Sequence, residues 1–269
     1  RMAKRPKACL LERNSRLREL VLEKLELKWS PEQISGGFKR TMPRQKAMQI
    51  SAETIYKTLY FRSRSALHHL LVKHLRRSHS LRHGKRHTRK GERGTINIVN
   101  GISIHERSRH IDNRRTFGHW EGDLVSGTNN SHIATLVDRK SRYTIILKLS
   151  GKDAGSVNQA ITEKFKTLPR KLRQSLTWDR GMELAKHLEF TANAGVKVYF
   201  CDPQSPWQRG TNENTNGLIR QYFPKKTCLA QYSQQELDTV AAQLNSRPRK
   251  ILKFKTPKEV IEKSVALTS

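Results

Sequence analysis

The sequence predicts an α/β fold: a mixed sheet with flanking helices in residues 118–269, preceded by a small all-α region in residues 1–70 and a basic linker in residues 71–117. Three observations support this division. Short apolar runs separated by turn residues follow Gly118, which is typical of consecutive antiparallel strands. Further strand-like runs then alternate with helical patterns, as expected for a sheet covered by helices. Residues 72–95 show no apolar periodicity, so no packed element is expected there.

The first region carries three helix signals. Apolar residues recur at roughly helical spacing in residues 15–28. A second helix is expected at Ser30, which can cap it together with Gln33, with Pro31 at the first helical position. A third is expected after Ser51. Three short helices, the third basic and aromatic, fit either a helix-turn-helix DNA-binding module or a structural three-helix bundle, and both interpretations stay open.

Net charge is the strongest signal in the composition. The chain has 53 Lys and Arg residues against 23 Asp and Glu, a formal net charge of +30. Such an excess repels itself in a compact fold unless a polyanion is the usual partner, and nucleic acid is the obvious polyanion. Residues 72–95 hold nine Lys and Arg residues and four histidines. We expect a linker that follows the DNA backbone there rather than a metal site, because fixed cations repel a metal ion.

Candidate DNA contacts are basic residues at three places along the chain. They are Lys57 and Arg62 in the third helix, Arg76, Arg77, Lys85 and Arg86 in the linker, and Arg220, Lys225 and Lys226 around the end of a later helix. Such side chains can neutralise backbone phosphates. For the last three residues, an ordinary basic helix end is the competing interpretation.

The cellular compartment is indicated by what the sequence lacks. Its three cysteines are widely spaced and form no C-x-x-C pair, which favours a reducing compartment. The sequence has no apolar run of transmembrane length and no signal-peptide pattern. We therefore expect a soluble intracellular protein with no membrane association.

The second half is expected to fold in the order βββ-α-β-α-β-α-α. The first three strands correspond to HWEGDLV, HIATLVD and YTIILKL. The later elements are a helix over 156–168, a strand over 175–179, a helix over 183–194, a strand over 197–202 and helices over 211–223 and 233–245. This order predicts a mixed sheet with helices packed on it.

Three acidic residues of this half could form a metal site. Asp123 lies in the first strand, Asp179 ends the fourth, and Glu213 lies in the first turn of a helix. If the first and fourth strands are neighbours, the two aspartates converge and the helix start can fold over them. Converging carboxylates need cations between them, and oxygen ligands without sulfur favour Mg²⁺ or Mn²⁺. Taken singly, each acid could equally be a cap, a surface charge or a salt-bridge partner.

Other acids of the second half fit structural roles better. Glu121 shares the face of Asp123 on the first strand and could orient a ligand. Asp138 is expected to form a turn salt bridge, and Glu183 fits the first turn of a helix. Asp202 follows a strand as Asp179 does, but Pro203 indicates a strand-ending turn.

Several motifs resemble one family of bacterial transposases. They are GHWEGD, IATLVDRKSRYTIIL, TWDRGMELAKH, YFCDPQSPWQRGTNENTNGLIRQYFPK and LNSRPRKILKFKTPKEV. Together they resemble the insertion-sequence-thirty family, and the likeness runs from about Trp29 to the C-terminus. The resemblance implies a ribonuclease H-like catalytic fold, shared with retroviral integrases, and an Asp-Asp-Glu triad of Asp123, Asp179 and Glu213. The 33 residues between Asp179 and Glu213 agree with the spacing of this family.

The resemblance also implies an activity. A transposase of this class uses Mg²⁺, or Mn²⁺, to cleave DNA at the ends of an insertion element and to join the freed 3′-hydroxyl to target DNA. The expected partners are double-stranded DNA, both terminal inverted repeats and target, and further copies of the same chain. The expected location is the bacterial cytoplasm at the nucleoid. The family usually has a further N-terminal end-recognition region, which we expect this chain, starting at Arg1, to lack. A DNA-binding regulator that does not cut, and a nuclease acting on RNA–DNA hybrids, are the two alternatives.

Overall fold

A computed structural model of the chain describes residues 10–61, 100–181 and 184–266, which form two compact units. The helical unit comprises residues 10–61 and 247–256, and the sheet unit comprises the remaining described residues. Five of the predicted DNA contacts, all basic, lie outside the described residues: Arg62, Arg76, Arg77, Lys85 and Arg86.

The helical unit is built from short capped helices, as predicted. Its elements are α1 (Leu10–Arg13), α2 (Ser15–Glu26), α3 (Pro31–Thr41), η1 (Lys46–Met48) and α4 (Ala52–Phe61). Ser30 and Gln33 form the expected capping box at the start of α3. One apolar core joins the helices, with Leu17, Ile34 and Ile55 fully buried. The predicted three-helix arrangement is therefore confirmed, whereas DNA binding by it stays a prediction.

A segment from near the C-terminus completes the helical unit. Residues 247–256 contain η7 (Lys250–Leu252) and fold back on themselves through a bridge between Arg249 and Lys255. The Phe254 ring packs so closely on Gly36 of α3 that a Cβ there would lie 2.2 Å from it. Lys250 Nζ also forms an ion pair of 2.6 Å with Glu32 of α3. Gly36 thus admits an aromatic ring that any other residue would exclude.

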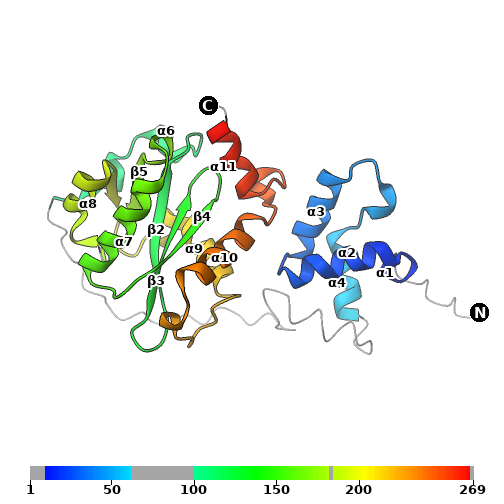
Figure 1. Cartoon of the computed structure of the whole chain (residues 1–269). Helices are drawn as coiled ribbons and strands as arrows, with labels where there is room; N and C mark the ends of the chain where they lie inside the picture. Colours follow the sequence, from blue (N-terminus) through cyan, green and yellow to red (C-terminus); the bar gives the residue numbers. More distant parts are fainter. Residues whose placement is uncertain (1–9, 62–99, 182–183, 267–269) are drawn as a thin grey trace, which may run out of the picture. The chain divides into compact units, whose positions relative to one another are not determined.

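Within the described residues, the sheet unit contains one mixed sheet with the strand order β1-β6-β5-β2-β3-β4 (Figure 1). The strands are β1 (Ile102–Ser103), β2 (His119–Ser126), β3 (His132–Asp138), β4 (Thr144–Lys148), β5 (Ser175–Trp178) and β6 (Lys197–Phe200). β2, β3 and β4 are antiparallel, as predicted. On the other side of β2, the strands β5, β6 and β1 run parallel to it. The sheet therefore includes Ile102–Ser103, a pair that the sequence places within the linker.

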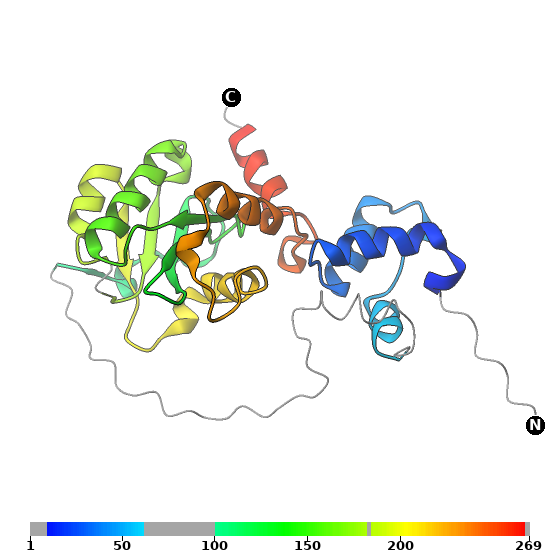
Figure 2. The ribbon, with the colours of Figure 1, turned by 60° about the horizontal axis from the view of Figure 1, so that its bottom comes forward.

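Helices cover both faces of the sheet (Figures 1 and 2). They are α6 (Arg109–Asp112), α7 (Ala154–Thr167), α8 (His187–Ala194), α9 (Gly210–Ile219), α10 (Gln234–Asn245) and α11 (Pro257–Ala266), with the short turns η2 (Ile104–Glu106), η3 (Arg170–Leu172), η5 (Pro206–Arg209) and η6 (Leu229–Gln231). One apolar core lies between the sheet and α7 and α8, and a second between the sheet and α9 and α10. Side chains alternate along a strand, so Trp120 enters the first core and Val125 the second. Glu121 and Asp123 share the face of Val125, toward α9.

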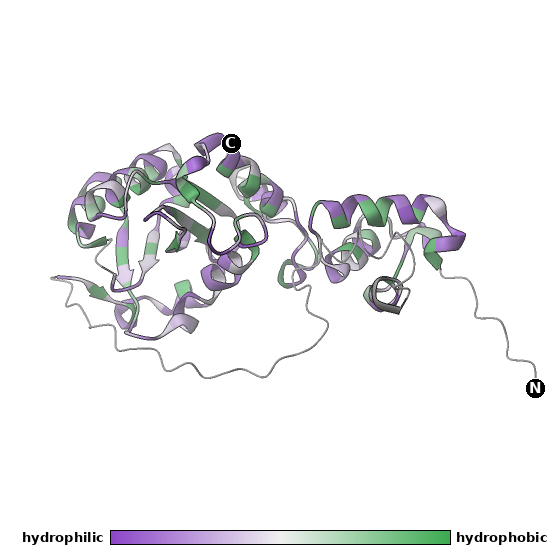
Figure 3. Ribbon diagram, turned by 90° about the horizontal axis from the view of Figure 1, so that it is seen from below, coloured by the Kyte–Doolittle hydropathy of each residue, from purple (hydrophilic) through white to green (hydrophobic). Residues whose placement is uncertain are grey.

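Helix boundaries differ from the sequence-based ranges at some ends. The helix expected over 183–194 has α8 only from His187, and Glu183 lies outside the described residues. The helix expected over 211–223 ends at Ile219. Hydrophilic and hydrophobic segments alternate along the helices in Figure 3, in agreement with their amphipathic sequence patterns. None of the helices in the described part of the chain is long and apolar enough to cross a membrane.

Candidate active site

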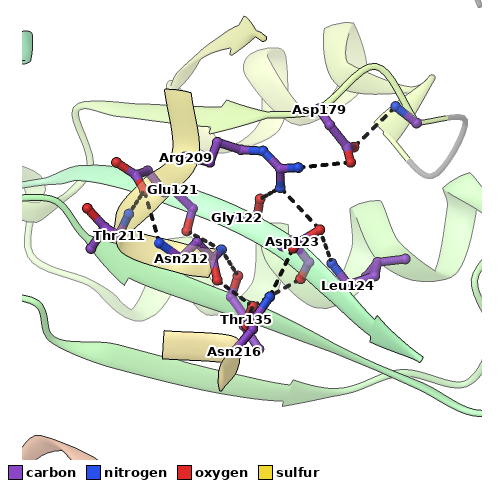
Figure 4. Close-up of polar contacts among 11 residues, drawn as sticks. Glu121, Gly122, Asp123, Leu124, Thr135, Asp179, Arg209, Thr211, Asn212 and Asn216 are labelled. Atoms are coloured by element: carbon purple, nitrogen blue, oxygen red, sulfur yellow. Dashed lines mark hydrogen bonds and ion pairs between the residues drawn. The ribbon is translucent and has the colours of Figure 1, made fainter. Parts of the chain in front are cut away.

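Asp123 and Asp179 meet around one guanidinium group (Figure 4). β2 and β5 are parallel neighbours, so Asp123 in β2 and Asp179 just after β5 lie at the same edge of the sheet. Arg209, the last residue of η5, reaches both: Nη1 lies 3.1 Å from Asp123 Oδ1 and Nη2 lies 3.0 Å from Asp179 Oδ2. Arg209 Nη1 also donates to the carbonyl of Gly122 at 2.8 Å. The convergence of the two aspartates expected from the strand order is confirmed.

Protein donors also hold both carboxylates, and Asp123 Oδ1, which faces Arg209, accepts a hydrogen bond from the backbone N–H of Leu124 at 3.0 Å. Asp123 Oδ2 accepts a hydrogen bond from Asn216 Nδ2 at 2.9 Å, and Asp179 Oδ1 accepts one from the backbone of Gly181 at 3.2 Å. The oxygens facing Arg209 are Asp123 Oδ1 and Asp179 Oδ2. Both carboxylates therefore have fixed orientations before any ligand binds.

The electrostatics of the pair follow from burial and mutual repulsion. Burial raises the pKa of Asp123, the Arg209 guanidinium opposes this, and the nearby Asp179 carboxylate adds to it. Burial alone would lower the pKa of Arg209, but attraction to the two carboxylates outweighs burial and raises it. The Arg209 guanidinium thus offsets part of the cost of burying the Asp123 carboxylate close to Asp179.

The first turns of α9 are tied to β2 and β3. Asn212 Nδ2 donates to the carbonyl of Glu121 at 2.9 Å, and Asn216 Nδ2 donates to Asp123. The Thr135 hydroxyl of β3 lies 3.0 Å from the amide oxygen of each asparagine and can donate to either one. These contacts fix the helix that carries Glu213 directly over the sheet edge that carries Asp123 (Figure 4).

Glu121 holds the start of α9. Its side chain has no exposed surface, and its Oε2 accepts hydrogen bonds from the backbone N–H groups of Thr211 at 2.9 Å and Asn212 at 3.0 Å. A carboxylate at a helix N-terminus is favoured by the helix dipole and satisfies two backbone donors. Its Oε1 accepts from Arg139 Nη1 at 2.8 Å. The sequence led us to expect that Glu121 orients a ligand or a lysine; in the structure it holds the start of a helix and pairs with an arginine.

Glu213 lies apart from the two aspartates. It is exposed in the first turn of α9. Among the residues that the structure describes, no three His, Cys, Asp or Glu side chains are grouped closely enough to hold a metal ion. Two of the three predicted acids are thus together, and the third stands on the adjacent helix.

Comparisons with known proteins identify relatives of the chain. Residues 113–206 match the family model of the integrase core domain. The chain is 82% identical over 268 residues to the transposase InsI of insertion sequence element IS30C from Escherichia coli strain K12, spanning 100% of this chain and 70% of that protein. It is 44% identical over 245 residues to the transposase of IS1086 from Cupriavidus metallidurans, covering 90% of this chain and 71% of the relative. The catalytic core domain of BIV integrase aligns with a TM-score of 0.42 at 18% identity, over 56% of this chain and 97% of that structure.

The chain belongs to the IS30 family of transposases. It is therefore an enzyme of DNA transposition, with an integrase-type catalytic core that acts as a polynucleotidyl transferase. The ribonuclease H-like sheet with flanking helices, expected from the resemblance, is confirmed by the integrase-core match and the strand order.

Two further acids of the transposase have structural partners. Asp138 is buried and accepts hydrogen bonds from the backbone of Gly118 at 2.9 Å and Ser141 at 2.7 Å, so it stabilises its turn through hydrogen bonds where we expected a salt bridge. Asp202 Oδ2 accepts from Gln208 at 2.7 Å and lies 2.8 Å from His105 Nε2. Asp202 thus shapes the loop that ends at Arg209.

The described basic residues proposed to contact DNA differ in their surroundings. Lys57 is exposed and pairs with Glu53 at 2.7 Å. Arg220 donates to the backbone carbonyl of Ser126 at 2.8 Å, which fixes the end of α9 against β2. Lys225 and Lys226 are exposed in the following turn. These DNA contacts stay predictions.

Arg209 and Asn216 are the site residues that sequence reasoning missed. Both lie in the quoted motif that runs from Tyr199 to Lys225. The sequence offered only one signal for Arg209, namely that it precedes the predicted acid Glu213 by four positions. The path of its loop could not be predicted, because no apolar periodicity runs through it.

Proposed function

We propose that this transposase cleaves DNA at the ends of an insertion element and transfers the freed 3′ ends to target DNA, using Asp123, Asp179 and Glu213 to hold Mg²⁺ or Mn²⁺. The observation that carries the proposal is the bridging of Asp123 and Asp179 by one cationic group. The residues fit divalent metals, because Arg209 shows that two carboxylate oxygens already converge on one cation. Hard oxygen donors without sulfur are the ligands that Mg²⁺ prefers.

The helix geometry supports the assignment of Glu213 as the third acid. Residues three apart on a helix lie on neighbouring parts of one side. Asn216, three residues after Glu213, contacts Asp123 directly. Glu213 lies one helical turn before Asn216, and we infer that it joins the two aspartates by a rotamer change or a small shift of the α9 start when metal binds.

The residues of the chain supply position and charge to the reaction. Asn216 and the backbone of Leu124 hold the Asp123 carboxylate, and the backbone of Gly181 holds Asp179 Oδ1, so both carboxylates are oriented for a metal. Bound metal ions would activate a water or 3′-hydroxyl and stabilise the leaving oxygen of the phosphodiester. The surrounding cationic chain favours binding of the polyanionic substrate.

The partners we propose follow from the reaction and the charge. The formal net charge of +30 supports binding of double-stranded DNA, comprising both the element ends and the target. Joining two ends in one event requires that they be held together, so we propose that the transposase acts as a homo-multimer. Its substrate places it in the bacterial cytoplasm at the nucleoid.

A strand-cleavage and strand-transfer assay with Mg²⁺ tests the proposal. Asp123→Asn, Asp179→Asn and Glu213→Gln should each reduce transfer on the order of a hundredfold or more, the scale of losing one transition-state-stabilising group. Glu163→Gln is the matched control, because Glu163 is exposed on α7 on the opposite face of the sheet. DNA retention by each variant, measured in the same samples, separates lost chemistry from lost binding.

Two results would overturn the proposal. Full transfer by any of the three triad variants would remove that acid from the site. Metal-independent DNA binding with no cleavage by the unaltered chain, on DNA that a related transposase cuts, would favour a regulator that occupies ends without cutting them.

A further inference from the structure

Arg209 occupies the position where a metal ion would meet the two aspartates. Its guanidinium contacts Asp179 Oδ2 and Asp123 Oδ1, the second of which also accepts a hydrogen bond from the backbone of Leu124 (Figure 4). Its side chain is only 13% exposed, and its Nε has no hydrogen-bond partner. A guanidinium is always charged and matches two carboxylates with its planar set of donors. It is therefore a cationic ligand of this pair in its own right.

The guanidinium and a metal ion cannot hold these two oxygens together. Both are cations that would lie between Asp123 Oδ1 and Asp179 Oδ2, so their mutual repulsion opposes binding of both at once. Arginine is not deprotonated in proteins, so Arg209 keeps its charge. The side chain has to move for a metal ion to bind.

The structure allows this movement without loss of α9. Arg209 is the N-cap residue of α9, but its side chain forms no capping hydrogen bond. Glu121 instead accepts the first free backbone N–H groups of the helix, at Thr211 and Asn212. Next to Arg209 in the loop, Trp207 is 72% exposed. Releasing the Arg209 side chain therefore leaves the start of α9 held to β2.

We propose that Arg209 is an arginine latch: in the metal-free transposase it bridges Asp123 and Asp179, and metal binding has to displace it. The inference rests on the proposed metal site and adds its regulation. The latch holds the two close carboxylates in place without metal. It also weakens metal binding, because each binding event breaks the guanidinium bridge.

Metal binding by the full chain tests the latch without any activity readout. The probe is Mn²⁺, titrated and followed by electron paramagnetic resonance of the free ion. Measurements at about pH 8, far above ordinary carboxyl pKa values, limit competition from protons. Arg209→Gln should bind Mn²⁺ about tenfold more tightly than the unaltered chain, a difference of about 1.4 kcal/mol in binding free energy. Arg209→Lys should lie between the two, because a lysine keeps the charge but cannot bridge two carboxylates with a planar fork.

Arg180→Gln is the matched control for charge. Arg180 follows Asp179 and donates its Nε to the carbonyl of Cys201 at 3.2 Å, so its removal deletes one nearby charge while leaving the guanidinium bridge in place. It should change Mn²⁺ affinity by less than about threefold, since a partly exposed charge is screened. An equal gain in Arg180→Gln and Arg209→Gln would show a general charge effect and overturn the latch.

Thermal unfolding provides the second measurement. Without metal, Arg209→Gln should unfold at a lower temperature, because two close carboxylates lose their shared cation. Saturating Mn²⁺ should raise its unfolding temperature more than that of the unaltered chain, because no bridge is lost on binding. Equal increases in the two proteins would contradict the latch even if the absolute affinities were difficult to compare.

Asp123→Asn separates failure of the latch from failure of the proposed metal site. If Asp123→Asn abolishes Mn²⁺ binding but Arg209→Gln and Arg209→Lys bind as the unaltered chain does, the latch is wrong and the metal site stands. If Asp123→Asn leaves Mn²⁺ affinity unchanged, both the metal site and the latch are wrong.

Discussion

Replacing Glu121 with Gln should strongly lower the free energy of unfolding of the sheet unit. Glu121 is fully buried, accepts two backbone N–H groups at the start of α9 and pairs with Arg139. In Glu121→Gln the amide oxygen can serve the two N–H groups, but the amide NH₂ then faces the Arg139 guanidinium, another donor. Arg139 is left buried without its carboxylate.

The magnitude follows from this unpaired charge. Breaking a buried ion pair by removing one partner costs about 3–5 kcal/mol. Asp112 Oδ1, 3.6 Å from Arg139 Nη2, retains part of the attraction, so we expect the lower end, about 3 kcal/mol. Domains of this kind are stable by only about 5–15 kcal/mol, so the loss should be large in urea unfolding. Fluorescence of the buried residues Trp120 and Trp178 reports on the unit directly.

A double change distinguishes the ion pair from general damage. Glu121→Gln combined with Arg139→Met removes both charges, and replacing a buried pair with apolar groups is often close to neutral, so at least about 1 kcal/mol should be recovered. Glu163→Gln, an exposed change on α7, should stay within about 0.5 kcal/mol. Amide hydrogen exchange should rise in α9 and not in α7. A loss below about 1 kcal/mol for Glu121→Gln would refute the argument that Glu121 holds α9.

Two further predictions concern β2. Gly122→Ala should lower the free energy of unfolding in urea by about 1–3 kcal/mol, because its Cβ would lie 2.1 Å from the Trp178 ring. Gly210→Ala, which has open space around it, should not destabilise the protein. Equal effects of the two changes would contradict this packing argument. His119 is held neutral, because burial and then nearby cations lower its pKa from 6.5 to about 4. A lowered histidine pKa gives stability that is complete above pH 6.5 and is lost as the pH falls toward 4. The slope of unfolding free energy against pH in this window should flatten in His119→Gln, and an unchanged slope would assign it to other groups.

The sheet was predictable because its strands carry local signals. β2, β3 and β4 are apolar runs bounded by turn residues, and their antiparallel pairing follows from short connections. β1 carries no such signal: it is two residues long, and only its pairing with β6 makes it a strand. A pairing between residues so far apart in the chain cannot be recognised from a short stretch of sequence.

The candidate site was likewise predictable only where local sequence signals exist. Asp123 and Asp179 could be brought together from strand order alone, because ends of adjacent parallel strands meet at one edge. The position of Arg209 depends on the path of the loop from Asp202 to Gln208, which is set by side-chain hydrogen bonds between those two residues. Glu121 was recognisable as a neighbour of Asp123, but its capping of α9 depends on a contact across 90 residues.

The two-part construction of the helical unit has a consequence for how the chain is made. A growing polypeptide emerges from its N-terminus, so residues 10–61 are complete long before residues 247–256 exist. Until Phe254 is synthesised, Gly36 lacks the aromatic ring that packs on it, and Glu32 lacks its lysine partner. All six strands of the sheet lie between these two parts and are translated before residues 247–256. The helical unit therefore begins to form before the sheet unit but acquires its last packing contacts after every strand of the catalytic core has been synthesised.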